Sequence, residues 1–96
     1  MKLLPRHLRY LVELKKVGFY VSVFDNYILF ERPGNKVVIE QEYLPSHRKR
    51  YRIQIVEGTF ETSKHTKYAN TLLSALQFLV DRYCPQAKNT LDKFLG

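Results

Sequence analysis

The residues best suited to chemistry lie at positions 48–52, where four permanent cations surround one tyrosine: Arg48, Lys49, Arg50, Tyr51 and Arg52. A guanidinium is a planar fork that matches a phosphate, and an aromatic ring can stack on a nucleobase. Tyr43 precedes this run and is a second candidate for stacking. These residue types predict contact with phosphate or another polyanion. The competing interpretation is a solvated turn whose charge only keeps the protein soluble.

A second basic segment, Lys64–Tyr68, follows about twelve positions later. Glu57 and Gly58 lie between the two segments and predict a turn. If the strands on either side pair around this turn, residues 49–52 and 62–66 lie near one another. We therefore expect one positive surface, to which Lys64 and Lys67 contribute as secondary contacts.

The overall charge favours the same kind of partner. Sixteen Lys and Arg oppose nine Asp and Glu, which gives a formal net charge of +7. Such a charge attracts polyanions, of which nucleic acid is the most common. The net charge does not indicate whether that nucleic acid is DNA or RNA.

Metal, cofactor and redox chemistry have little support in the sequence. His7, His47 and His65 match no zinc-ligand spacing, and Cys84 is the one cysteine. We expect no metal and no cofactor, and we expect Cys84 to be a buried structural residue. A single cysteine also favours a reducing, cytoplasmic compartment. Pro5 and early cations interrupt any signal-peptide core, and no apolar run is long enough to span a membrane, so we expect no membrane association.

Three acidic residues are candidates for a nuclease centre, namely Asp25, Glu40 and Glu42. Metal-dependent nucleases often place an acid after one strand and an acid-x-lysine on the next. The segment Glu40-Gln41-Glu42 lacks that lysine, and its two carboxylates share one strand face. No glycine-rich phosphate loop is present either. The sequence therefore favours a binding protein over an enzyme and leaves that question open.

The pattern of apolar residues predicts a single α+β domain over residues 1–96. Helical spacing of Leu4, Leu8, Leu11 and Leu14 predicts a first helix over Pro5–Val17. Alternation and turn residues predict four or five antiparallel strands in a meander: Phe19–Phe24, Tyr27–Arg32, Lys36–Leu44, Arg50–Val56 and Thr59–His65. The apolar hairpin 19–32 is expected to be central in the sheet. A second helix, capped by Asn70 or Thr71, runs to Tyr83, and a short terminal helix follows over Ala87–Leu95. Both main helices should cover one face.

The function predicted from these observations is non-enzymatic binding of nucleic acid through a basic sheet-and-loop surface, with little sequence specificity. The alternative is a small protein-interaction module that binds an acidic protein or forms a homodimer through an edge strand. The size and basic character of the chain are typical of accessory factors of phages, plasmids or other mobile elements. Salt dependence separates the two, because phosphate binding weakens steeply with salt.

Overall fold

The computed structural model describes residues 1–58 and 63–85 of the chain. Two helices precede and follow five strands. Their bounds are α1 Pro5–Lys16, β1 Tyr20–Val23, β2 Tyr27–Arg32, β3 Asn35–Tyr43, β4 Lys49–Glu57, β5 Ser63–Ala69 and α2 Leu72–Tyr83. The short helix predicted over Ala87–Leu95 lies outside the described residues.

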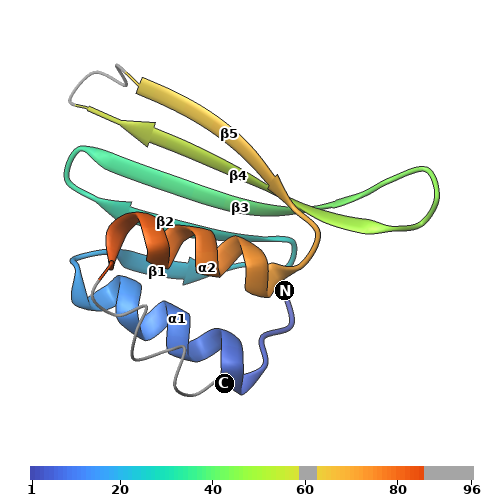
Figure 1. Cartoon of the computed structure of the whole chain (residues 1–96), viewed down its shortest axis with the longest axis horizontal. Helices are drawn as coiled ribbons and strands as arrows, with labels where there is room; N and C mark the ends of the chain where they lie inside the picture. Colours follow the sequence, from blue (N-terminus) through green and yellow to red (C-terminus); the bar gives the residue numbers. More distant parts are fainter. Residues whose placement is uncertain (59–62, 86–96) are drawn as a thin grey trace.

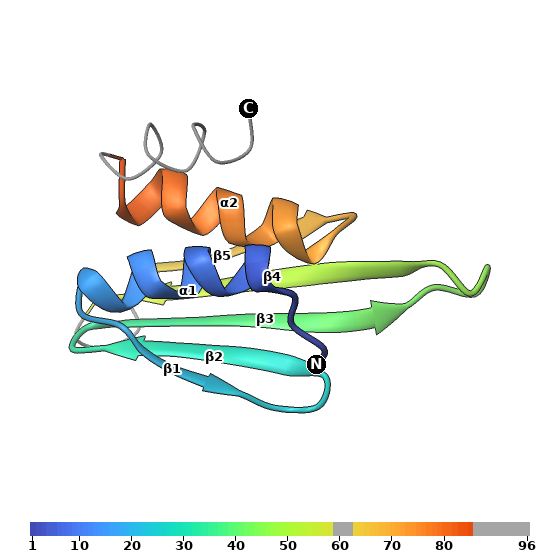
Figure 2. The same ribbon diagram turned by 90° about the horizontal axis from the view of Figure 1, so that it is seen from below.

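The strands form one antiparallel sheet in the order β1-β2-β3-β4-β5, so each strand pairs with its neighbour in sequence (Figure 1). Figure 2 shows α1 and α2 on the same side of this sheet. We call that side the helix-covered face and the other side the open face. The predicted α+β meander with two helices on one face is confirmed.

Alternation along the strands builds the core. Side chains that point to the helix-covered face are fully buried on the three middle strands: Ile28, Phe30, Val37, Ile39, Ile53 and Ile55. Leu14 of α1 and Leu76, Leu79 and Val80 of α2 cover them. Tyr51 shares the face of Ile53 and Ile55 and is half-buried. Burial of this apolar surface is the main favourable contribution to folding.

Two predictions about the strands were wrong. The hairpin of β1 and β2 is not central, because the meander order leaves β1 at the edge of the sheet with one neighbour. The fifth strand is Ser63–Ala69 and not Thr59–His65. Glu57 pairs with Ser63, so the connection is longer than a tight turn and the strand is displaced along the chain. Phe60 and Thr62 of the predicted strand lie outside the described residues.

The apolar stripe of α1 also differs from the prediction. Leu11 and Leu14 are buried, but Leu4 and Leu8 are exposed, with 48% of Leu8 accessible. Tyr10 and His7 take the inward places instead. The predicted stripe combined two helix faces, and the sheet selects the one that carries His7.

His7 has a capping role at the start of α1. Its Nδ1 accepts a hydrogen bond from the backbone N–H of Leu4 at 2.9 Å, which satisfies one of the donors left unpaired at a helix start. Only 7% of the side chain is exposed. Burial, and to a lesser degree the charge of Arg6, lower the pKa of His7 below 6.5. The folded protein therefore prefers the neutral imidazole.

A pH-dependent loss of stability follows from this cap. Because the folded pKa lies below the unfolded one, the stabilising contribution of His7 is complete above about pH 6.5 and is lost as the pH falls through the folded pKa. We expect the Tm of the wild type to fall between about pH 7 and pH 5, and that of His7→Gln to fall less, since glutamine accepts the same bond without titrating. Thermal unfolding followed by circular dichroism measures both. Parallel Tm profiles for the two proteins would contradict this role.

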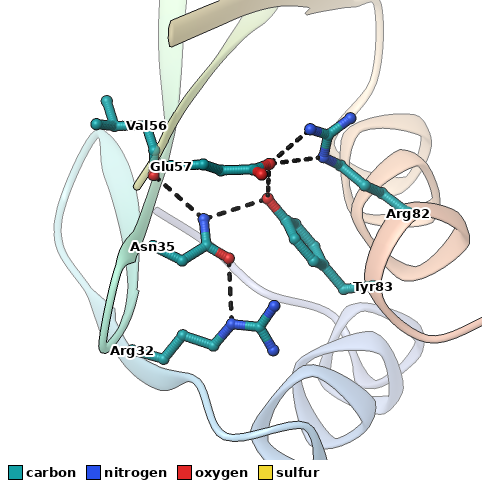
Figure 3. A network of polar contacts seen from close by, with 6 residues as sticks. All are labelled: Arg32, Asn35, Val56, Glu57, Arg82 and Tyr83. Atoms are coloured by element: carbon teal, nitrogen blue, oxygen red, sulfur yellow. Dashed lines mark hydrogen bonds and ion pairs between the residues drawn. The ribbon is translucent and has the colours of Figure 1, made fainter. Parts of the chain in front are cut away.

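A polar network fixes one end of the β3–β4 hairpin to α2 (Figure 3). Glu57, the last residue of β4, accepts hydrogen bonds from Arg82 at 2.5 and 3.2 Å and from the Tyr83 hydroxyl at 3.1 Å. Asn35, the first residue of β3, donates to the Tyr83 hydroxyl and to the carbonyl of Val56. The hydrogen bond from Arg82 is the main cause of a lowered pKa at Glu57.

Arg32 extends this network to α1. Its Nε donates to Asn35 at 3.1 Å, and its Nη1 donates to the carbonyl of Val17, just after α1, at 2.8 Å. The guanidinium also lies 4.4 Å from the ring centre of Phe19 and 5.0 Å from that of Tyr83. One side chain thus joins both helices to the sheet at this end, which we call the clamped end.

Candidate nucleic-acid interface

The β3–β4 hairpin projects beyond the rest of the sheet at the end opposite the clamped end. β2 begins with Tyr27 opposite Glu40, and β5 ends with Ala69 opposite Tyr51. Residues 42–50 therefore pair only across their own hairpin, and Figures 1 and 2 show them extending past both helices. We call residues 42–50 the β3–β4 arm.

A tight turn shapes the tip of the arm. The N–H of His47 donates to the carbonyl of Leu44 at 2.9 Å, and the N–H of Leu44 donates to the carbonyl of Arg48 at 2.8 Å. Pro45 suits the second position of such a turn because its φ is fixed. His47 has a φ of 62°, the left-handed conformation typical of a three-residue hairpin loop. Residues 45–47 thus form the tip, and Arg48 follows directly after it.

The arm brings together three of the predicted contact residues: Tyr43, Arg48 and Lys49. Both cations are exposed, and 67% of the Tyr43 side chain is accessible. The Lys49 ammonium lies 5.8 Å from the ring centre of Tyr43, across the strand pair that joins these two residues. Within residues 1–58 and 63–85, no carboxylate forms an ion pair with Arg48 or Lys49. Their charge is therefore available to a polyanion.

Arg50 and Arg52 lie on the open face, where both form ion pairs with carboxylates. Arg50 donates to Glu42 at 3.2 and 3.3 Å and covers the ring of Tyr68, with 4.3 Å to its centre. Arg52 pairs with Glu40 and, at 3.0 Å, with Glu42. The positive charge of the predicted cluster is thus partly neutralised at its β4 end.

Sequence reasoning missed these ion pairs, although a signal for them was present. The two residue numbers of each cross-strand pair in this hairpin add up to 92, so Glu42 pairs with Arg50 and Glu40 pairs with Arg52. The predicted loop, residues 45–49, centres on His47 and would have placed Glu42 opposite Arg52. The observed centre is Ser46, one residue earlier, and it places each acid opposite an arginine. Glu40 and Glu42 were correctly predicted to share one strand face.

The second basic segment does not join the first in the predicted way. Lys64 pairs with Val56 and Lys67 with Ile53, whereas Arg52 lies opposite Tyr68. The two lysines therefore point to opposite faces of β5, Lys64 to the open face and Lys67 to the helix-covered face. The expectation that residues 62–66 lie beside 49–52 was wrong, because the longer β4–β5 connection displaces the register.

Lys64 instead borders a shallow hollow of about 320 Å³ on the open face. Lys36 and Lys64 lie on either side of Val56, and Gln54 and Thr66 complete the polar rim. The hollow lies toward the clamped end, several residues along the strands from the arm. It is separate from the arm cations.

The other candidates for chemistry have structural partners. The carboxylates of Glu40 and Glu42 bind arginines, and among the residues that the structure describes, no group of three or more His, Cys, Asp or Glu could hold a metal ion. Cys84 is 5% exposed, and its thiol donates to the carbonyl of Glu13 at 3.5 Å. Burial raises the pKa of this thiol, so little thiolate forms near neutral pH. The prediction that Cys84 is buried is confirmed.

Comparison with known proteins does not assign a function. No protein-family model matches the sequence, and no curated protein and no solved structure shows significant similarity to it. Neither helix described here is long and apolar enough to cross a membrane. The function is therefore argued from the arm and its surroundings.

Proposed function

We propose that this protein binds nucleic acid without catalysis, through the β3–β4 arm. The observation that carries the proposal is the projection of Arg48 and Lys49 beyond the sheet, without a carboxylate partner among the described residues. Because the arm projects, it can reach a polyanion without contact between the polyanion and the rest of the protein. Backbone charge would supply most of the affinity, with little sequence readout.

The roles of the predicted contacts follow from their positions. Arg48 and Lys49 are the primary phosphate contacts, and Tyr43 is an accessible ring beside them. Arg50 and Arg52 contribute less, because Glu42 and Glu40 share their charge. Lys64 and Lys67 remain secondary candidates, and Tyr51 supports the base of the arm through its hydroxyl bond to Gln41.

Loss of the arm cations should weaken binding. We expect Arg48→Ala/Lys49→Ala to bind labelled nucleic acid roughly tenfold more weakly at about 100 mM salt, and the log–log salt slope to become shallower by about 2. Fluorescence anisotropy across a salt series measures both quantities. The matched control is Lys15→Ala/Lys16→Ala, which removes the same charge from exposed lysines in the last turn of α1.

The two double variants separate a specific surface from net charge. Equal weakening by both would show that the overall charge of +7 drives binding and that the arm has no special role. No binding by the wild type, even at low salt, would remove the nucleic-acid proposal.

One observation favours the protein-interaction alternative. The edge strand β1 has no charged residue, and Tyr20 is 83% exposed, whereas the opposite edge strand carries Lys64 and Lys67. Charged side chains on an edge discourage pairing with another chain, and their absence permits it. Sedimentation velocity over a range of protein concentrations tests self-association. A mass that stays at that of one chain would exclude a homodimer formed through β1.

A further inference from the structure

We propose that the nucleic acid is duplex DNA in the B form and that the β3–β4 arm enters its major groove. This inference rests on the proposed function and names the class of ligand for the same surface. Three features of the arm support it, namely its dimensions, the state of the nearby tyrosines and the charge at its base.

The dimensions of the arm match the major groove. From the row of Gln41 and Tyr51 to the row of Leu44 and Arg48, each strand adds three residues, or roughly 10 Å at 3.4 Å per residue, and the three-residue loop lies beyond that row. The major groove of B-form DNA is roughly 8.5 Å deep and 12 Å wide, and it admits a two-stranded ribbon. A ribbon with its side chains is about 10 Å thick, which exceeds the minor groove of about 6 Å. The deep, narrow major groove of A-form RNA excludes side chains.

The tyrosines argue against a single strand as the ligand. Binding of single strands uses several accessible rings on which successive bases stack. Of the tyrosines at the arm and its base, Tyr68 is covered by the Arg50 guanidinium at 4.3 Å, and Tyr51 is half-buried. Tyr43 and Tyr68 are both exposed, but a cation lies over a ring face of each, Lys49 at 5.8 Å and Arg50 at 4.3 Å, so neither ring offers both faces to stacked bases.

Exposed cations lie at the base of the arm, together with the carboxylates of Asp25, Glu40 and Glu42. Both helices begin at the arm end of the molecule, and the N-terminus lies there as well (Figure 2). The first turn of α1 carries the exposed Arg6. When the arm lies in a groove, the phosphates on the groove rims face this end of the protein. Arg48, the first residue after the tip, then lies near the base edges.

Three oligonucleotides of one mixed sequence, about 20 base pairs or nucleotides long, test the ligand class by fluorescence anisotropy: duplex DNA, duplex RNA and single-stranded DNA. We expect duplex DNA to bind about tenfold more tightly than either of the others. The groove is tested with the same DNA duplex carrying glucosylated 5-hydroxymethylcytosine, which fills the major groove, and with netropsin, which fills the minor groove. Glucosylation should weaken binding by about tenfold, and netropsin should leave it unchanged.

The outcomes separate this inference from the proposed function. No binding to any of the three oligonucleotides removes both. Tighter binding to duplex RNA or to single-stranded DNA overturns the ligand class while the proposed function stands. Displacement by netropsin, without an effect of glucosylation, overturns the major groove. Arg48→Ala/Lys49→Ala should also lose the difference between plain and glucosylated DNA, whereas Lys15→Ala/Lys16→Ala should keep it.

Discussion

Replacement of Arg32 by alanine is expected to lower the free energy of unfolding by about 2–4 kcal/mol. The change removes hydrogen bonds to Asn35 and Val17 and the contacts of the guanidinium with Phe19 and Tyr83. It leaves the carbonyl of Val17 without this donor at the end of α1. For a chain of this size, Tm should fall by roughly 4–8 °C per kcal/mol. Thermal and urea unfolding measure the two quantities.

Two further variants show whether the fork of Arg32 is responsible. Arg32→Lys keeps the positive charge but cannot hold two acceptors in one planar fork. We therefore expect its free energy of unfolding to lie between that of the wild type and that of Arg32→Ala. Arg48→Ala removes an exposed arginine from the arm and should change stability by at most about 0.5 kcal/mol. A stability of Arg32→Ala equal to that of Arg48→Ala would show that the clamped end does not depend on this residue.

Removal of two carboxylates should strengthen nucleic-acid binding. In Glu40→Gln/Glu42→Gln, Arg50 and Arg52 lose their ion-pair partners while side-chain volume is kept. We expect affinity to rise about tenfold or more at about 50 mM salt, and the log–log salt slope to steepen by up to about 2. The same anisotropy series measures both. Stability should fall by about 1 kcal/mol, because partly exposed ion pairs contribute little.

A gain in affinity is hard to explain by structural damage, which makes this variant informative. The control Glu13→Gln removes one carboxylate from α1, where Glu13 pairs with Lys16 at 3.2 Å, and should raise affinity far less. If the double variant binds with unchanged affinity and slope, Arg50 and Arg52 do not face the bound polyanion. The contact surface would then be confined to the tip of the arm.

Much of the fold could be predicted from local pattern. Alternation in Tyr27–Arg32 and Arg50–Val56 and helical spacing in Pro5–Val17 located these elements to within one or two residues. The position of β5 could not be predicted, because it depends on the length of a connection that the local pattern does not specify. The edge position of β1 was missed because its weak polarity suggested burial on both faces, whereas Tyr20 is exposed on the open face.

The candidate site was predicted in its residues but not in its arrangement. Arg48 and Lys49 were identified by type and spacing, and they follow directly after the tip of the projecting arm. Arg50 and Arg52 belong to the same run, yet cross-strand carboxylates hold both. Adjacent cations in the sequence therefore differ in the charge that they offer to a ligand.

The sequence alone determined the elements, their order, the net charge and the basic turn, because these depend on residue type and short-range periodicity. Only the tertiary structure decided that the turn lies at the end of a projecting arm, since β2 and β5 stop pairing before residues 42–50. Only the cross-strand register decided which cations are neutralised. Both outcomes depend on contacts between residues distant in the chain, whose register is set by loop lengths and by burial of one sheet face and not by local pattern.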